Sequence, residues 1–173
     1  MDLEDTKNIS QYRDIPEYSK EQYEKGNIVL GGVDQFFTMS DDGTMNFNDE
    51  TNEAVKNALT NLSKRDTPWL IFCIEGKDRT GFICAVLEAL CNASWSDIID
   101  DYMESYVNYY KISEESDPGM WMTIRQQDIM PVIRFLQGDD GEKIDPHDAA
   151  YSYLERIGMK AEDIDRLYDR LCK

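Results

Sequence analysis

A cysteine and an arginine separated by five residues mark the stretch of this chain that could do chemistry. Cys73 follows the apolar run Trp69–Phe72, which is short enough for a buried strand, and Arg79 precedes an apolar helix predicted over Thr80–Asn92. A strand that turns through a loop into a helix directs backbone N–H groups and the positive helix end at one point, which suits a dianion. The same groups favour the nucleophilic thiolate, and an arginine fork matches two phosphate oxygens. The pattern predicts phosphoryl transfer through a cysteinyl-phosphate intermediate.

The segment Cys73–Gly81, which reads Cys-Ile-Glu-Gly-Lys-Asp-Arg-Thr-Gly, resembles the signature loop of the cysteine-dependent tyrosine phosphatases. In particular it looks like the bacterial branch, related to dual-specificity and phosphoinositide phosphatases, whose loop reads His-Cys-x-x-Gly-Lys-Asp-Arg-Thr-Gly. The resemblance continues at Ile98–Tyr102 with Ser105, and at Tyr153–Gly158. It therefore covers residues 67–172.

The resemblance implies a nucleophile and a set of phosphate ligands. Cys73 would attack phosphorus, Arg79 would bind the phosphoryl oxygens, and Thr80 would donate a hydrogen bond to the cysteine sulfur. Lys77 would contact the phosphate or a second acidic group of an inositol substrate, or would only offset local acidity. The implied phosphate-binding residues are Ile74, Glu75, Gly76, Lys77, Asp78 and Arg79. This mechanism requires neither a metal nor an organic cofactor.

The acid that protonates the leaving oxygen has more than one candidate. Asp78 could serve as that acid, or it could hold the loop through hydrogen bonds. A carboxylate beside a dianion is useful as an acid only if its pKa is raised. Asp34, in the segment Gly31–Gln35, is the first choice for a separate acid, ahead of Asp41 and Asp42 on the following turn.

Phe72 occupies the position where the family has a histidine that orders the loop. Phenylalanine cannot donate a hydrogen bond, so the thiolate would depend on backbone N–H groups, the helix dipole, Arg79 and Thr80. The first functional hypothesis is a phosphomonoester hydrolase acting on phosphoprotein or phosphoinositide substrates. The second is a weak or inactive phosphate-binding module. A third, an acidic helical interaction protein, predicts no affinity for anions.

Composition restricts the partners and the compartment. The 18 positive and 35 negative side chains give a net charge of -17, which opposes binding to nucleic acid or to an anionic membrane surface. No stretch is apolar enough to span a membrane, and the acidic start Met1–Asp5 does not resemble a signal peptide. The sequence therefore predicts a cytoplasmic protein without stable membrane association. It indicates no oligomeric state.

The remaining cysteines and the single histidine predict no metal site. Cys84, Cys91 and Cys172 form no CxxC pair and lack the spacing of zinc ligands. Cys84 and Cys91 lie seven residues apart on one predicted helix, so we expect both to be small core residues. His147 follows a proline at a predicted helix start, and we expect it at the surface or in the cap region.

The hydrophobic pattern predicts a helix-rich α/β fold. We expect a phosphatase-like central sheet flanked by helices, with its N-terminal part incomplete or truncated. Thr67–Cys73 is the clear strand, and Ile28–Leu30 is a weaker one for which a buried turn is the alternative. The chain would be a fragment, a diverged minimal version, or one part of a sheet that another chain completes. Helices are predicted at 16–25, 49–64, 80–92, 95–110, 121–136 with a break at Pro131, 146–156 and 161–171.

The predicted domain organisation is simple. A chain of 173 residues is long enough for one domain with a sizeable core. We expect a polar N-terminal segment at 1–27 and a phosphatase-like catalytic domain at 28–173.

Overall fold

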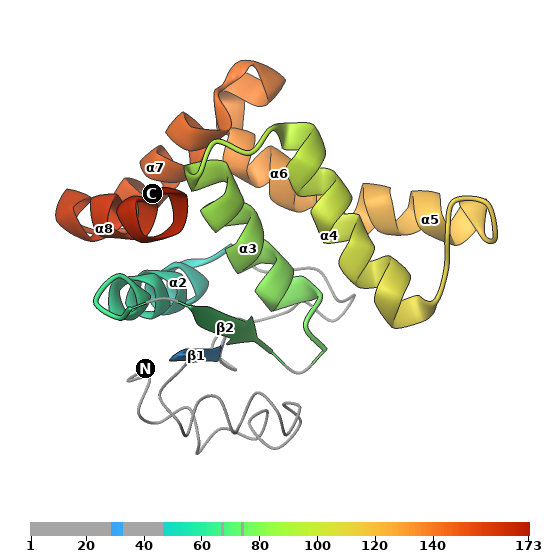
Figure 1. Ribbon diagram of the computed structural model, residues 1–173. Helices are drawn as coiled ribbons and strands as arrows, with labels where there is room; N and C mark the ends of the chain where they lie inside the picture. The colour runs from blue at the N-terminus through green and yellow to red at the C-terminus, as the bar shows by residue number, and fades with distance from the viewer. Residues whose placement is uncertain (1–28, 33–46, 67, 74) are drawn as a thin grey trace.

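A computed structural model describes residues 29–32, 47–66, 68–73 and 75–173 of the chain, most of which are helical (Figure 1). The elements are, in chain order, β1 (Val29–Gly32), α2 (Asp49–Leu62), β2 (Trp69–Phe72), α3 (Asp78–Leu90), α4 (Trp95–Tyr110), α5 (Pro118–Ile124), the π-helix η3 (Arg125–Ile129), α6 (Met130–Gln137), the 3-10 helix η4 (Gly138–Lys143), α7 (Pro146–Arg156) and α8 (Ala161–Cys172). The predicted helices at 49–64, 80–92, 95–110, 146–156 and 161–171 are confirmed, with ends that shift by at most two residues. The predicted helix at 16–25 and the domain boundary after residue 27 lie outside the described residues.

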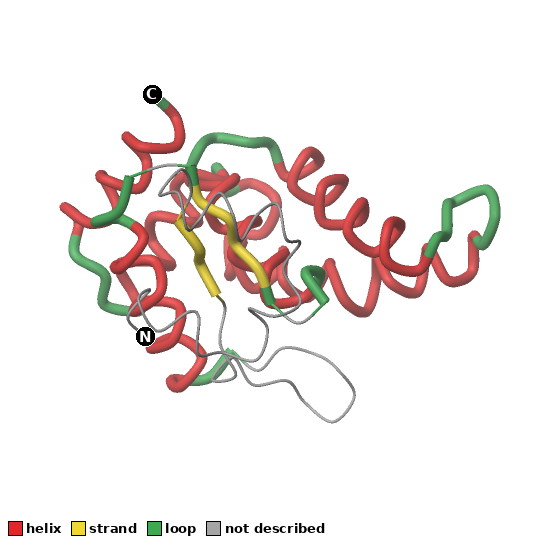
Figure 2. The backbone as a smooth tube through the Cα atoms, turned by 60° about the horizontal axis from the view of Figure 1, so that its bottom comes forward, coloured by secondary structure: helices red, strands yellow, loops and turns green. Residues whose placement is uncertain are grey.

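Within the described residues the sheet consists of β1 and β2, which pair in parallel (Figure 2). Val29 is opposite Trp69 and Gly32 is opposite Phe72. Two parallel strands need a crossover connection, and α2 lies in the connection between them. The strand predicted before Cys73 is confirmed, and the weaker strand is confirmed one residue further along. The helix-rich character is confirmed, whereas a larger central sheet stays a prediction.

Helix α3 runs through the middle of the molecule (Figure 1). It packs against α4, α7, α8 and β2, and eight of its 13 residues are buried. Phe82 is fully buried and makes an edge-to-face contact with Tyr153 of α7, with 5.9 Å between the ring centroids. A helix that is apolar on nearly all sides belongs in the interior. The packing of α3 fixes the position of its N-terminal end, where the cysteine loop arrives.

Side-chain caps begin three of the helices where the sequence predicts them. Asn48 accepts a hydrogen bond from the first turn of α2, and Asp145 does the same for α7. Ser94 and Asp97 form a reciprocal capping box at the start of α4. Gly158 follows α7 with φ 89°, a conformation that glycine adopts without steric penalty. These local signals explain why the helix ends agree with the sequence prediction.

The helix predicted at 121–136 is interrupted, as expected from Pro131. Proline lacks a backbone N–H and its ring clashes with the carbonyl four residues earlier, so an α-helix cannot continue through it undisturbed. The chain forms the π-helical turn η3 just before the proline and then continues as α6. Such π turns occur often at functional sites. This one carries Asp128.

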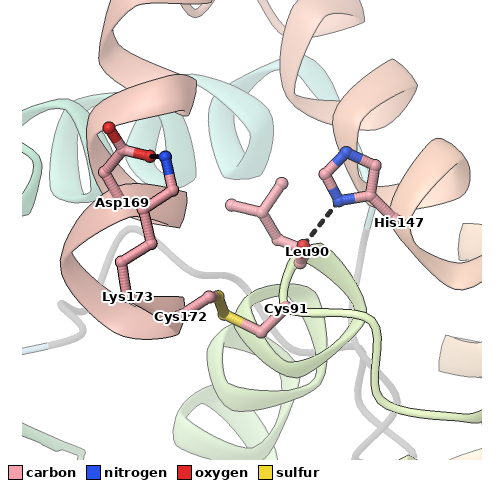
Figure 3. The surroundings of a disulfide bond; sticks show 6 residues. All are labelled: Leu90, Cys91, His147, Asp169, Cys172 and Lys173. Atoms are coloured by element: carbon pink, nitrogen blue, oxygen red, sulfur yellow. Dashed lines mark hydrogen bonds and ion pairs between the residues drawn. A yellow bond between two sulfur atoms is a disulfide. The ribbon is translucent and has the colours of Figure 1, made fainter.

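A disulfide joins Cys91 to Cys172, the last residue of α8 (Figure 3). The prediction that Cys91 is a small core residue is therefore wrong, because Cys91 is half-buried and bonded to Cys172. Cys91 follows the end of α3, and the packing of α8 against α3 brings a cysteine 81 residues away to a Cα–Cα distance of 5.8 Å. Cys84 is a free, half-buried thiol.

His147 has a packing role that the sequence did not predict. Its Nδ1 lies 2.6 Å from the carbonyl oxygen of Leu90, at the C-terminal end of α3 (Figure 3). Its ring also makes an edge contact with Tyr168 of α8. The half-buried imidazole thus links α7 to α3 and α8.

In the part of the chain that the structure describes, no helix has the length and apolar character needed to cross a membrane.

The carboxyl group of Glu88 on α3 generates a prediction about pH. Burial, followed by the charge and hydrogen bond of Asp101, raises the pKa of Glu88 from 4.5 to about 8. The folded protein therefore holds this proton more tightly than the unfolded chain, so the free energy of unfolding falls as pH rises from 4.5 towards 8. Glu88→Gln cannot ionise, and we expect its melting temperature to fall less than that of the wild type across this range.

The matched control is Glu155→Gln on the exposed face of α7, which should follow the wild-type pH dependence. Thermal unfolding monitored by circular dichroism at pH 5, 6, 7 and 8 would measure the difference. If the melting temperatures of the wild type and Glu88→Gln changed with pH in parallel, Glu88 would ionise in the folded protein without loss of stability.

Candidate active site

The cysteine loop connects β2 to α3. Cys73 follows the last residue of β2 and is half-buried, and α3 begins five residues later at Asp78. The backbone N–H of Gly76 donates a hydrogen bond to the Cys73 sulfur over 3.2 Å. Gly76 has φ 73°, which lets the loop turn back without a side-chain clash. One backbone donor of the loop, the N–H of Gly76, is therefore directed at the sulfur.

The first turn of α3 has no side-chain cap. Lys77 is its N-cap residue and makes no capping hydrogen bond, in contrast to the capped starts of α2, α4 and α7. Helix α8 also starts without a side-chain cap, but no cysteine precedes it. Arg79 and Thr80 lie in the first turn of α3. Uncapped N–H groups next to a cysteine and an arginine provide donors for an anion.

Lys77 is held by the carboxylates on either side of it in the loop. Its Nζ lies 3.1 Å from Glu75 Oε2 and 2.7 Å from Asp78 Oδ2, and the residue is only 8% exposed. Burial opposes the charge, but the hydrogen bond and charge of Asp78, followed by the hydrogen bond of Glu75, raise the pKa of Lys77 above its ordinary value. In this structure Lys77 holds the loop carboxylates together.

Asp78 connects the loop to the neighbouring helix. Its Oδ1 accepts a hydrogen bond from the Tyr106 hydroxyl and its Oδ2 accepts one from Lys77. Its backbone carbonyl accepts a further hydrogen bond, over 3.0 Å, from the Tyr102 hydroxyl. Burial, then Tyr102 and Asp78, raise the pKa of Tyr106, so that its phenol keeps the proton it donates. Of the two roles predicted for Asp78, this geometry favours holding the loop.

Four tyrosines line the face of α4 that meets the loop. The tyrosine stripe consists of Tyr102, Tyr106, Tyr109 and Tyr110. The Lys77 ammonium lies 5.0, 5.6 and 5.8 Å from the ring centroids of Tyr106, Tyr109 and Tyr110. The Tyr109 hydroxyl donates to Glu75 Oε1 over 2.8 Å. Sequence analysis assigned no role to the stripe, although its spacing of four, three and one residues places it on one helix face.

Comparison with known families gives one result. Residues 5–173 match the family described as the tyrosine phosphatase family. The chain belongs to the tyrosine phosphatase family. The match begins well before residues 67–172, the segment over which the sequence resemblance was found. Membership of this family indicates a phosphatase in general terms. The comparison with curated proteins found no match, and neither did the comparison with solved structures.

Asp128 is a carboxyl group of this phosphatase that sequence analysis missed. It is half-buried on η3, which packs against α4. Burial and the charge of Asp78 raise its pKa, and Lys77 partly opposes this effect. Asp128 thus lies within electrostatic reach of the phosphatase loop. In the sequence, the one feature that pointed to the region of Asp128 was the helix break predicted at Pro131.

The structure also shows the surroundings of Thr80 and Phe72, two further residues discussed in the sequence analysis. The hydroxyl of Thr80 is buried and has no hydrogen-bond partner among the described residues, so it does not donate to the cysteine sulfur here. Phe72 is buried at the end of β2, with 8% of its surface exposed. The described residues contain no group of three His, Cys, Asp or Glu side chains suited to a metal ion. Four predicted residues lie outside the described part of the chain: Asp34, Asp41, Asp42 and Ile74.

The contact between Gly81 and Tyr102 generates a stability prediction. A Cβ on Gly81 would lie 2.9 Å from Cζ of Tyr102, a ring that is only 2% exposed. Alanine normally stabilises a helix by about 1 kcal/mol relative to glycine. Here we expect Gly81→Ala to lower the free energy of unfolding by about 1–3 kcal/mol, because overpacking outweighs that gain.

Gly119→Ala on α5 is the matched control, because its Cβ would meet only Asp117 at 3.7 Å. We expect it to be at least as stable as the wild type in urea unfolding. A Gly81→Ala protein of wild-type stability would show that the Tyr102 ring moves aside easily.

Proposed function

We propose that this tyrosine phosphatase family member hydrolyses phosphate monoesters through a covalent intermediate on Cys73. The observation that carries the proposal is the loop geometry, in which a backbone N–H points at the Cys73 sulfur beside the uncapped start of α3. The resemblance of the loop to the bacterial branch, with dual-specificity and phosphocysteine chemistry, also supports it. In the first step a P–S bond forms and the P–O bond to the leaving group breaks. In the second step water attacks phosphorus, the thiolate leaves, and inorganic phosphate is released.

Arg79 and the loop N–H groups bind the phosphoryl oxygens in this proposal. Charge spreads over the equatorial oxygens in the transition state, so donors that converge on them lower the barrier. Lys77 is paired with Glu75 and Asp78 and acts mainly by keeping the loop in shape. The reaction needs no metal ion and no organic cofactor.

We assign the leaving-group proton to Asp128. Both carboxylate oxygens of Asp78 already accept hydrogen bonds, so a proton there would displace a donor. Asp128 is half-buried and its pKa is raised, which is the property that an acid needs near neutral pH. Asp34 is the remaining candidate from the sequence.

The proposed partners are phosphorylated proteins or phosphoinositides. The net charge of -17 argues against nucleic acid and against stable association with an anionic membrane. We propose the cytoplasm as the location, because Cys73 acts only as a reduced thiol and the cytoplasm is a reducing compartment. The Cys91–Cys172 disulfide is the feature that opposes this location, since disulfides persist mainly in oxidising compartments.

A phosphate-binding module without turnover is the second candidate. Two observations favour it: the buried phenyl ring of Phe72 offers no hydrogen bond to the loop, and the Thr80 hydroxyl does not bond to the sulfur. Such a module would bind phosphate or vanadate and would release no phosphate from an ester.

Variants of Cys73 and Arg79 test the hydrolase directly. We expect the wild type to hydrolyse p-nitrophenyl phosphate, and we expect no turnover from Cys73→Ser because serine is a far weaker nucleophile. Arg79→Lys should lose most of its activity while keeping the wild-type melting temperature, because an ammonium cannot form two parallel hydrogen bonds to phosphoryl oxygens. Steady-state kinetics with and without vanadate would measure these effects.

The control is Cys84→Ser, which removes the other free thiol and should keep the activity. Vanadate binding to a wild-type protein without turnover would support the phosphate-binding module instead. Equal turnover by wild type and Cys73→Ser would contradict the nucleophile assignment.

Leaving-group dependence tests the acid. Phenyl phosphate needs protonation of its leaving oxygen much more than p-nitrophenyl phosphate does. We expect Asp128→Asn to lose about 10²- to 10⁴-fold in kcat for phenyl phosphate, and far less for the activated ester. Asp78→Asn should slow both esters alike, because it loosens the loop. A selective loss with Asp34→Asn or Asp78→Asn would transfer the role of the acid to that residue.

A further inference from the structure

A pocket of about 520 Å³ lies between β2, α3 and α8. Its α3 wall extends from Cys84 to Cys91, whereas the cysteine loop joins the opposite end of that helix at Asp78. The Cys91–Cys172 disulfide attaches the α8 side of the pocket to the α3 side (Figure 3). Pockets of about 300–1,000 Å³ are the usual size of small-molecule sites. We call this cavity the α3–α8 pocket, and its lining residues are distinct from those of the candidate active site.

Most of the wall of the α3–α8 pocket is apolar. Pro68 and Ile71 line it from the β2 side, Leu87 from α3 and Leu171 from α8. Trp69 also lines the pocket, but its indole Nε1 is buried. An atom without accessible surface cannot face an open pocket, so Trp69 presents the carbon part of its ring system to the interior. The wall therefore offers apolar contact and an aromatic ring, and no indole hydrogen bond.

Three polar side chains complete the wall: Cys84, Glu88 and Arg170. The guanidinium of Arg170 is already engaged, because Nε donates to the Ser63 carbonyl over 3.1 Å and Nη1 lies 2.6 Å from Asp66 Oδ1. Burial raises the pKa of the Cys84 thiol to about 12, so this group stays neutral. Glu88 is therefore the side chain of the wall whose charge a ligand can change near neutral pH.

The carboxyl group of Glu88 pairs with a second carboxyl group. Asp101 of α4 forms a hydrogen bond with it, and two adjacent carboxyl groups hold one proton between them because two negative charges would repel. Among the other elements packed against α3, α8 contributes Arg170 to the same pocket and β2 has only uncharged side chains. The α7 side chain His147 contacts α3 further along, at the Leu90 carbonyl. Glu88 and Asp101 thus form a half-buried pair that holds a proton beside an apolar pocket.

An organic cation fits this combination of groups better than a neutral or anionic molecule does. Its positive charge would replace the shared proton, since a cation next to Glu88 favours the ionised form of the carboxyl pair. The ring of Trp69 adds an attraction that aromatic faces have for ammonium groups. The net charge of -17 draws cations towards the protein and opposes the approach of anions. The apolar wall accommodates a hydrocarbon body on the same molecule.

We infer that the α3–α8 pocket is a binding site for an organic ammonium ion with an apolar body, whose charge pairs with Glu88 and whose body packs against Trp69 and the aliphatic wall. Binding releases the proton that Glu88 shares with Asp101. The affinity consequently rises with pH until Glu88 is ionised without ligand. This site is additional to the proposed phosphatase site, and its occupancy does not depend on turnover there.

Benzyltrimethylammonium is a suitable probe, because its charge is permanent and does not change with pH. Titration calorimetry of the wild type at pH 6, 7 and 8 measures its affinity. With the pKa of Glu88 at about 8, the association constant should rise by about 9-fold from pH 6 to pH 7 and by about 5-fold from pH 7 to pH 8. Titrations at pH 7 in two buffers with different ionisation enthalpies should show the release of about one proton per ligand.

Two variants and a control assign this effect to the pocket. Glu88→Gln cannot ionise, so its association constant at pH 8 should fall by about 10-fold and should not change with pH. Asp101→Asn, at an exposed position of α4, removes the second carboxyl group and should shift the rise in affinity to lower pH. The control Glu155→Gln, on the exposed face of α7, should bind the probe as the wild type does. Melting temperatures would show that each variant is folded.

Several results would overturn the inference. They are no binding of the probe by the wild type, equal affinity in folded Glu88→Gln, and an affinity that does not change between pH 6 and pH 8. Benzyl alcohol and phenylacetate, the neutral and anionic counterparts of the probe, should bind more weakly at pH 8, and equal or tighter binding of either would also overturn it. If Glu88→Gln does not fold, the proton release of the wild type and its shift in Asp101→Asn decide the question. All of these measurements report binding, so a protein without phosphatase turnover can still pass or fail them.

Discussion

The hydrogen bonds accepted by Asp78 hold the site together. Asp78 is the first residue of α3, and its carboxylate and carbonyl bind Lys77 of the loop and two tyrosines of α4. Two of these hydrogen bonds are accepted by the charged carboxylate, and bonds to charged groups contribute about 1.5–3 kcal/mol each. The shape of the loop, the start of α3 and the orientation of the tyrosine stripe all depend on this residue.

The proposed phosphate site lies within a strongly acidic protein, so capture of an anion there would have to be local. The net charge of -17 opposes the approach of anions, and screening at physiological salt limits the reach of this surface charge to about 8 Å. Backbone N–H groups at the start of α3 act over hydrogen-bond distances and are unaffected by net charge. Within the loop, Lys77 pairs with the carboxylates of Glu75 and Asp78, and the Tyr109 hydroxyl donates a hydrogen bond to Glu75. With the proposed function, the protein would combine an acidic surface that repels anions with a phosphate site that acts at short range.

The sequence predicted the features that depend on neighbouring residues. The strand before Cys73, the caps at Asn48 and Ser94, and the break near Pro131 follow from local patterns, and the structure has all of them. Other features depend on how helices that are distant in the sequence pack together. These are the contact of α4 with the loop, the packing of η3 against α4, and the Cys91–Cys172 bond. No local pattern encodes these contacts, so the tyrosine stripe and Asp128 became visible only in three dimensions.

The Cys91–Cys172 disulfide places two opposite redox demands on one chain. A bond that closes a loop over 81 residues restricts the unfolded chain and is worth about 4.5 kcal/mol in the entropic model. It attaches the C-terminal helix to the far end of the helix that begins at the phosphatase loop. The proposed nucleophile at the near end of that helix works only as a reduced thiol. Reductant added to protect Cys73 therefore also loosens α8, and the protein has a limited range of redox conditions in which its stability and its chemistry are both at their best.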